Sequence, residues 1–166
     1  MIEKVILGLG SNAGNRFLNI SRTLKLISLS RNLDILKLSS IYETEPWGFK
    51  NQNNFLNCVA VCICRARPYT LLKELKSIEI AAGRMKRKRW RERESDIDIL
   101  FYGRRVIIGK KLIIPHPEIQ FRNFVLFPLN EIVPGFIHPV LKRSVRYLYM
   151  HSSDQCKVSV YKRQVI

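Results

Sequence analysis

The segment that most restricts the fold is FLNCVAVCIC, residues 55–64, in which Asn57 is the single polar residue. A strand that carries apolar side chains on both faces needs packed structure on both faces. We therefore expect this segment to be a central strand of a sheet that lies between two layers.

Apolar segments and helical patterns alternate around this central strand. We expect further strands at residues 4–9, 36–42 and 96–101. A helix with apolar residues at helical spacing should follow the first strand (Phe17, Ile20, Leu24, Ile27), and another should run from Pro68 to Gly83 (Leu71, Leu75, Ile78, Ala82).

The order strand–helix–strand–strand–helix–strand is that of the split βαβ, ferredoxin-like arrangement. It predicts one α+β domain over residues 1–166, with an antiparallel sheet and both long helices packed on one of its faces. The other face is left for ligands and for C-terminal additions. For these additions we expect a short strand at 106–108, helices near 123–130 and 141–149, and a strand near 158–161.

The charge of the chain predicts a polyanionic partner. With 29 basic and 13 acidic residues among 166, the formal net charge is +16. A nucleoside triphosphate, a nucleic acid or an anionic surface would fit this charge.

The chain shows no signal peptide and no apolar run long enough to span a membrane, so we expect a cytoplasmic protein. Its four cysteines match no zinc or redox spacing and are expected to be buried free thiols (Cys58, Cys62, Cys64) and one isolated thiol (Cys156).

The densest basic stretch leads directly into a pair of aspartates. Seven of the ten residues from 84 to 93 are Lys or Arg, and Asp96 and Asp98 follow. Residues i and i+2 of a strand share one face, roughly 6–7 Å apart, so both carboxylates should point the same way and Ile97 and Ile99 the other way. Paired oxygen ligands beside phosphate-binding cations are the components of a Mg²⁺-nucleotide site.

Two further groups of residues suggest a ligand pocket. His116 lies between two prolines that restrict its backbone, and Arg122 and Phe124 follow it as a cation and a ring at i and i+2. Phe55 and Asn57 share one face of the central strand and place an aromatic ring beside an amide. An amide that both donates and accepts hydrogen bonds suits the edge of a pterin or a purine.

The motifs together strongly resemble the 6-hydroxymethyl-7,8-dihydropterin pyrophosphokinase family, enzymes of folate synthesis. The resemblance is carried by LGLGSNAGNR (7–16), IYETEPWG (41–48), FLNCV (55–59), IEIAAGR (78–84), RWRERESDIDIL (89–100) and IPHPEIQFRNFVLFPLNEI (114–132). It implies a ferredoxin-like monomer that transfers the β,γ-pyrophosphoryl unit of ATP to the hydroxymethyl group of the pterin and releases AMP.

The resemblance also implies roles for individual residues. Asp96 and Asp98 would hold two Mg²⁺ ions and would form the catalytic set with Arg84 and Arg93. The implied ATP contacts are Glu79, Lys86, Arg89, Lys111, His116 and Arg122. The implied pterin contacts are Thr44, Pro46, Trp47, Phe55, Asn57, Trp90 and Phe124.

The chain departs from the family where relatives commonly have Trp-Gly-Pro-Arg and this sequence has Trp-Arg-Glu-Arg, residues 90–93. The loss of Gly and Pro removes a preset turn, so we expect the change to affect loop closure and turnover. The alternatives are a basic RNA-binding module, which leaves the two aspartates unexplained, and a metal-dependent nuclease, which would not release AMP from ATP.

Overall fold

The expected ferredoxin-like sheet is present in the computed structural model, which describes residues 2–46, 51–85 and 92–163. Its core elements are β1 (Glu3–Ser11), α1 (Arg16–Ser28), β2 (Leu33–Leu38), β3 (Ile41–Thr44), β4 (Phe55–Cys64), α2 (Pro68–Ala81) and β5 (Asp96–Tyr102). The strands pair in the order β5-β1-β4, and the other edge of β4 pairs with both β2 and β3. All pairings are antiparallel.

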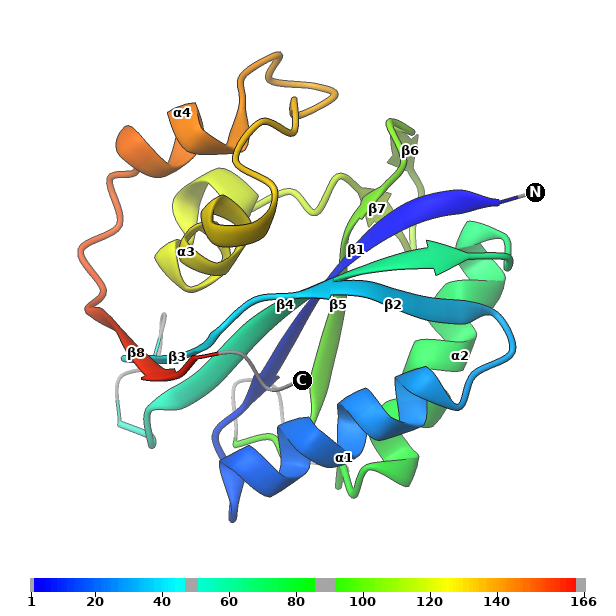
Figure 1. Cartoon of the computed structure of the whole chain (residues 1–166), viewed down its shortest axis with the longest axis vertical. Helices are drawn as coiled ribbons and strands as arrows, with labels where there is room; N and C mark the ends of the chain where they lie inside the picture. Colours follow the sequence, from blue (N-terminus) through cyan, green and yellow to red (C-terminus); the bar gives the residue numbers. More distant parts are fainter. Residues whose placement is uncertain (1, 47–50, 86–91, 164–166) are drawn as a thin grey trace.

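Helices cover both faces of the sheet, as expected from the apolar central strand. Figure 1 shows α1 and α2 on one face and α3 (Asn123–Ile132) with α4 (Val145–Met150) on the other. Alternate residues of β4 enter different cores: Cys58, Ala60 and Cys62 lie in the core under α1 and α2, while Val59 and Val61 lie in the core under α3 and α4. The sheet therefore separates two hydrophobic cores.

The prediction of a single strand at residues 36–42 was wrong, because β2 and β3 are separate strands on either side of Ser39 and Ser40. The Ser39 hydroxyl accepts a hydrogen bond from the backbone N–H of Val59 at 2.9 Å. The backbone N–H and the hydroxyl of Ser40 donate to the Glu131 carboxylate on α3 at 2.9 and 2.8 Å. The Ser39 N–H still donates to the Val59 carbonyl at 2.9 Å, but the Ser39 hydroxyl and the Glu131 carboxylate take the N–H groups of Val59 and Ser40 in place of backbone carbonyls, and the first strand ends here.

The C-terminal additions form the layer that contains α3 and α4. The strand expected near 158–161 is β8 (Val158–Lys162), which pairs with β3 and extends the sheet. The strand expected at 106–108 is part of a hairpin of β6 (Ile107–Ile108) and β7 (Ile113–Ile114), which is followed by the short helix η1 (Ile119–Phe121).

The helix predicted at 141–149 begins later than expected, at Val145. Lys142 has a φ of 55°, which a helix does not accommodate, and the Ser144 hydroxyl accepts the backbone N–H of Tyr147 at 3.1 Å as the N-cap. The prediction was therefore correct about the helix and wrong about its start.

Cys58, Cys62 and Cys64 are buried free thiols, as predicted, and Cys156 is half-buried. Burial raises the pKa of Cys58 and of Cys62 to about 12, so both thiols stay protonated. Among the described helices, none is long and apolar enough to cross a bilayer.

Candidate active site

A cavity of about 110 Å³ lies where the sheet meets the start of α3. Its sheet side includes Gly8 and Gly10 of β1, and Val125 of α3 lies among the lining residues. Eight residues that the sequence singled out also line it: Thr44, Phe55, Asn57, Arg93, Asp96, Asp98, Arg122 and Phe124. Residues from five separate segments of the chain are thus brought to one place.

Asp96 and Asp98 both line the cavity, whereas Ile97 and Ile99 are buried in the core under α1 and α2. This is the alternation expected for a strand, since successive side chains point to opposite faces. The prediction that the two carboxylates share one face is confirmed.

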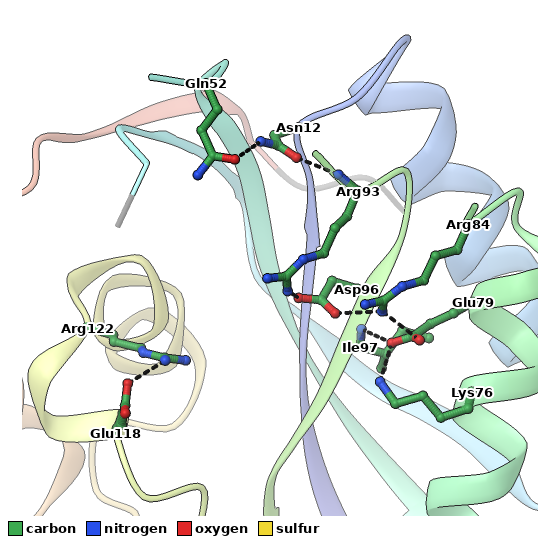
Figure 2. A network of polar contacts seen from close by, with 10 residues as sticks. All are labelled: Asn12, Gln52, Lys76, Glu79, Arg84, Arg93, Asp96, Ile97, Glu118 and Arg122. Atoms are coloured by element: carbon green, nitrogen blue, oxygen red, sulfur yellow. Dashed lines mark hydrogen bonds and ion pairs between the residues drawn. The ribbon is translucent and has the colours of Figure 1, made fainter. Parts of the chain in front are cut away.

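Asp96 lies between two arginines. Nη1 of Arg84 is 2.7 Å from Oδ1 of Asp96, and Nη1 of Arg93 pairs with Oδ2 (Figure 2). Burial alone would raise the pKa of Asp96, but the guanidinium groups of Arg93 and Arg84 outweigh it and lower this pKa. Asp96 is therefore ionised and already held beside positive charge.

Asp98 has the opposite electrostatic environment. Burial raises its pKa, and the charge of Asp96 raises it further, with partial opposition from His116. Within the described parts of the chain, Asp98 forms none of the ion pairs that hold Asp96. A carboxylate in this position is stabilised by an added cation.

The donor set at the two aspartates fits a metal ion that also binds phosphate. Among the described residues, no group of three or more His, Cys, Asp or Glu side chains is arranged to hold a metal. Mg²⁺ is commonly held by one or two carboxylates, with the remaining positions filled by water and substrate phosphates. Asp96 and Asp98 supply that minimal pair.

Glu79 lies behind Arg84 and does not line the cavity. Its carboxylate is 2% exposed and accepts hydrogen bonds from Lys76 Nζ and the backbone N–H of Ile97, both at 2.8 Å. Nη1 of Arg84 is 2.6 Å from its other oxygen. Burial raises the pKa of Glu79, while the charge of Lys76 lowers it in part. The structure therefore shows Glu79 as an anchor for Arg84 and for the start of β5.

The side chain of Asn57 places an amide with a fixed orientation at the cavity. Asn57 donates from Nδ2 to the Thr44 hydroxyl at 2.8 Å, and both side chains are buried. A Cβ atom at Gly10 would lie 2.8 Å from Oδ1 of Asn57, so only glycine leaves space for this amide. Phe55 and Phe124 place aromatic rings at the same cavity.

Several expected site residues are not brought to the cavity. Pro46 is buried but does not line the cavity, and Lys111 is exposed in the loop that joins β6 to β7. His116 is half-buried and accepts the backbone N–H of Glu118 at Nδ1, 3.3 Å away, although its charge affects Asp98. The remaining expected contacts lie outside the described residues: Trp47, Lys86, Arg89 and Trp90.

Further residues that had no expected role shape the site. Gly8, Gly10, Glu45, Gln52, Leu100 and Val125 also line the cavity. Next to the cavity, Asn12, which is 1% exposed, links Gln52 to Arg93 through hydrogen bonds. The glycines and Asn12 belong to the LGLGSN motif, whose strand–turn character was the available signal.

Comparison with known proteins identifies one family. The family model described as 7,8-dihydro-6-hydroxymethylpterin-pyrophosphokinase (HPPK) matches residues 6–134. The chain is 46% identical over 143 residues to the 2-amino-4-hydroxy-6-hydroxymethyldihydropteridine pyrophosphokinase of Aquifex aeolicus, covering 86% of this chain and 88% of that protein. It is 39% identical over 126 residues to the Bacillus subtilis protein of the same name, covering 76% and 75%.

Longer proteins match over part of their length. The folate synthesis bifunctional protein of Arabidopsis thaliana is 42% identical over 132 residues, which are 79% of this chain and 27% of that protein. Among solved structures, wild-type HPPK-DHPS of Plasmodium falciparum with pteroate gives a TM-score of 0.74 at 18% identity. That match covers 90% of this chain and 44% of the solved chain, and it shows a shared fold.

Proposed function

Because this chain belongs to the 7,8-dihydro-6-hydroxymethylpterin-pyrophosphokinase family, which carries out the pyrophosphokinase step of folate synthesis, we propose that ATP is its pyrophosphoryl donor. It transfers the β,γ-pyrophosphoryl group to the hydroxymethyl group of 6-hydroxymethyl-7,8-dihydropterin and releases AMP. One observation carries the proposal: the pair Asp96 and Asp98 faces a cavity that also contains Asn57 and two aromatic rings.

Asp96 and Asp98 would hold Mg²⁺, two ions in our proposal. Within the described residues Asp98 forms no ion pair like those of Asp96, and burial together with the charge of Asp96 raises its pKa, which supports this assignment. When bound, Mg²⁺ would neutralise phosphate charge and polarise the phosphoryl group under attack. The remaining ligands would be phosphate oxygens and water, as is usual for this ion.

Arg84 and Arg93 would stabilise the charge that develops on the transferred group. Both guanidinium groups already lie beside Asp96, whose oxygens they would share with Mg²⁺, so they are within reach of a polyphosphate bound to that metal. Such preorganised cations are an effective source of transition-state stabilisation. Arg122 at the cavity is a third candidate phosphate contact, and Lys86, Arg89, Lys111 and His116 remain expected ones.

The pterin would lie against Phe55 and Phe124, with Asn57 reading its edge. Since one hydrogen of the Asn57 amide is committed to Thr44, its second hydrogen and Oδ1 remain for the heterocycle. Trp47, Pro46 and Trp90 remain expected pterin contacts from the sequence. Positioning of two bound substrates can supply much of the rate without a dedicated general base.

We also propose that the active unit is a monomer in the cytoplasm. One chain brings Asp96, Asp98 and Asn57 together at one cavity, and a monomeric active unit needs this. The buried free thiols Cys58, Cys62 and Cys64 suit a reducing compartment.

The deciding experiment is AMP release from ATP with Mg²⁺ and 6-hydroxymethyl-7,8-dihydropterin. We expect pterin-dependent AMP from the wild type, and its loss in Asp98→Ala and after removal of Mg²⁺ with EDTA. Asp34→Ala is the matched control, because Asp34 on β2 is exposed and pairs with Arg65 away from the cavity.

Three results would contradict the proposal. ADP in place of AMP would indicate transfer of a single phosphoryl group. Full activity of Asp98→Ala would remove the metal assignment. A folded wild type that binds RNA and does not bind ATP would favour the RNA-binding alternative.

A further inference from the structure

One buried side chain joins two segments that border the cavity. Asn12 directly follows β1 and is 1% exposed. Its Nδ2 donates to Oε1 of Gln52 at 3.1 Å, and its Oδ1 accepts the backbone N–H of Arg93 at 2.8 Å (Figure 2). Nδ2 also donates to the backbone carbonyl of Asn53 at 3.4 Å. Both polar atoms of the amide are therefore in use.

The contact between Asn12 and Arg93 continues the sheet beyond its last strand pair. The β1–β5 pairing ends at Gly10 and Asp96. Past that point, the backbone N–H of Asn12 donates to the carbonyl of Arg93 at 3.0 Å, and the Asn12 side chain accepts the N–H of Arg93. Two hydrogen bonds thus fix the Arg93 backbone relative to β1.

The fixed backbone determines where the Arg93 side chain can reach. Arg93 pairs with Asp96, three residues further along, and both residues line the cavity. A small displacement of the Arg93 backbone would move the guanidinium group away from Asp96. Displacements of about 1 Å, even from a mutation outside the reacting centre, can cost about 100-fold in rate.

We propose that Asn12 is a positioning residue for pyrophosphoryl transfer and acts through Arg93. Asn12 is buried and is not among the cavity-lining residues, so it has no direct access to a substrate. The inference rests on the proposed function insofar as it assigns Arg93 to the transferred group. Beyond that function, Asn12 is identified as the residue that positions Arg93.

The first test is independent of catalysis and uses amide hydrogen exchange at Arg93 in the whole protein. Asn12→Ala removes the acceptor of this N–H and should speed its exchange by about 10-fold or more, since an unbonded amide loses protection. Asn19→Ala is the matched control: Asn19 donates to the Ala13 carbonyl at 2.8 Å and the Ser11 hydroxyl at 3.3 Å, beside Asn12. It should leave exchange at Arg93 unchanged.

The second test is a double-mutant cycle on kcat. Asn12→Ala should lower kcat about 10-fold or more while the KM for each substrate changes less than about 3-fold. In an Arg93→Ala background the same change should cost nothing further, because residues that act through one another are not additive. Asn12→Asp keeps the acceptor for the Arg93 N–H but loses the donation to Gln52 and Asn53, so relative to Asn12→Ala it should restore the protection of the Arg93 amide and part of kcat.

The outcomes separate the inference from the proposed function. Equal loss of kcat from Asn12→Ala with and without Arg93, or equal effects of Asn12→Ala and Asn19→Ala, would overturn the inference. Full kcat in Arg93→Ala would also overturn it, while AMP production would still support the proposed function. A wild type that makes no AMP would contradict the proposed function, and the exchange rate of the Arg93 amide would then decide whether Asn12 positions Arg93.

Discussion

Glu79 and Arg84 form an ion pair in which Nη1 of Arg84 lies 2.6 Å from Oε2 of Glu79, a carboxylate that is 2% exposed. The same guanidinium nitrogen is 2.7 Å from Asp96. Through Arg84, the buried carboxylate of Glu79 on α2 is thus connected to Asp96 on β5, which lines the cavity. Glu79 therefore has a structural role in the site that does not depend on contact with a nucleotide.

We expect Glu79→Gln to lower the free energy of unfolding by about 2 kcal/mol, because two cations and a backbone N–H lose a charged partner. Partial exposure of Lys76 and Arg84 keeps the loss below that of a fully buried pair. Urea denaturation measures it. Glu74→Gln on the same helix is the control, since Glu74 accepts from the neutral side chains of Ser30 and Asn32 and should cost about 1 kcal/mol. Equal losses would argue against a special role for Glu79.

We expect Gly10→Ala to weaken pterin binding by about 10-fold and to affect ATP binding much less. The added Cβ would lie 2.8 Å from Oδ1 of Asn57 and would displace the amide, at a cost of about 1–3 kcal/mol. Isothermal titration with each substrate measures the two affinities. At Gly135 an added Cβ meets no atom within 4 Å, so Gly135→Ala is the matched control. A pterin affinity unchanged in Gly10→Ala would show that Asn57 does not read the heterocycle.

Stability should fall below about pH 6.5 through His138. Its ring is buried against Phe101, and Nδ1 accepts the backbone N–H groups of Val140 and Leu141 at 3.3 and 3.1 Å. Burial lowers the pKa of His138, so the unfolded chain takes up this proton more readily than the folded one. Its contribution is therefore complete above the unfolded pKa of about 6.5 and is lost as the pH falls towards the lower folded pKa, with a slope of at most about 1.4 kcal/mol per pH unit.

The control for this pH dependence is His138→Asn, whose side-chain oxygen can accept the same N–H groups and does not titrate. The free energy of unfolding of both proteins is measured by denaturant at several pH values between 5 and 8. Below about pH 6.5 the free energy of unfolding of the wild type should fall relative to that of His138→Asn. Parallel curves would show that His138 does not set the slope.

The Arg91→Gly/Glu92→Pro variant should raise kcat by about 3-fold and leave nucleotide affinity within about 2-fold. Pro and Gly would restore a preset turn and reduce the conformational freedom that has to be lost before catalysis. Arg91 lies outside the described residues, and Oε1 of Glu92 accepts from Nδ2 of Asn53 at 3.0 Å. Asn53→Ala removes that hydrogen bond alone and separates its effect from that of the turn. Stopped-flow turnover and nucleotide titration provide the two numbers, and an unchanged kcat would contradict the prediction.

The features predictable from the sequence were those with local signals. The nearly continuous apolar run of β4 indicated packing on both faces, and the i, i+2 spacing of Asp96 and Asp98 fixed their common direction. Pro68 and Gly83 marked the ends of α2 to within two residues. Each of these depends on the geometry of one element, which the order of residues determines.

The features that the sequence did not predict depend on partners far along the chain. The break between β2 and β3 arises because Ser40 bonds to Glu131, 91 residues away. Asn12 contacts Arg93 at a separation of 81 residues. Glu79 could be matched to the family but not placed behind Arg84, since its burial results from packing of α2 on β5.

The two hydrophobic cores on opposite faces of the sheet have a consequence for the order in which the molecule opens. Each core can lose its packing in a separate sub-global unfolding event, because the sheet divides them. The cavity needs the α3 side for Phe124 and Val125 and the strands for its aspartates. The cavity is therefore lost as soon as the less stable of the two cores unfolds. A bound substrate that contacts both sides would make the two cores unfold together, as one cooperative unit.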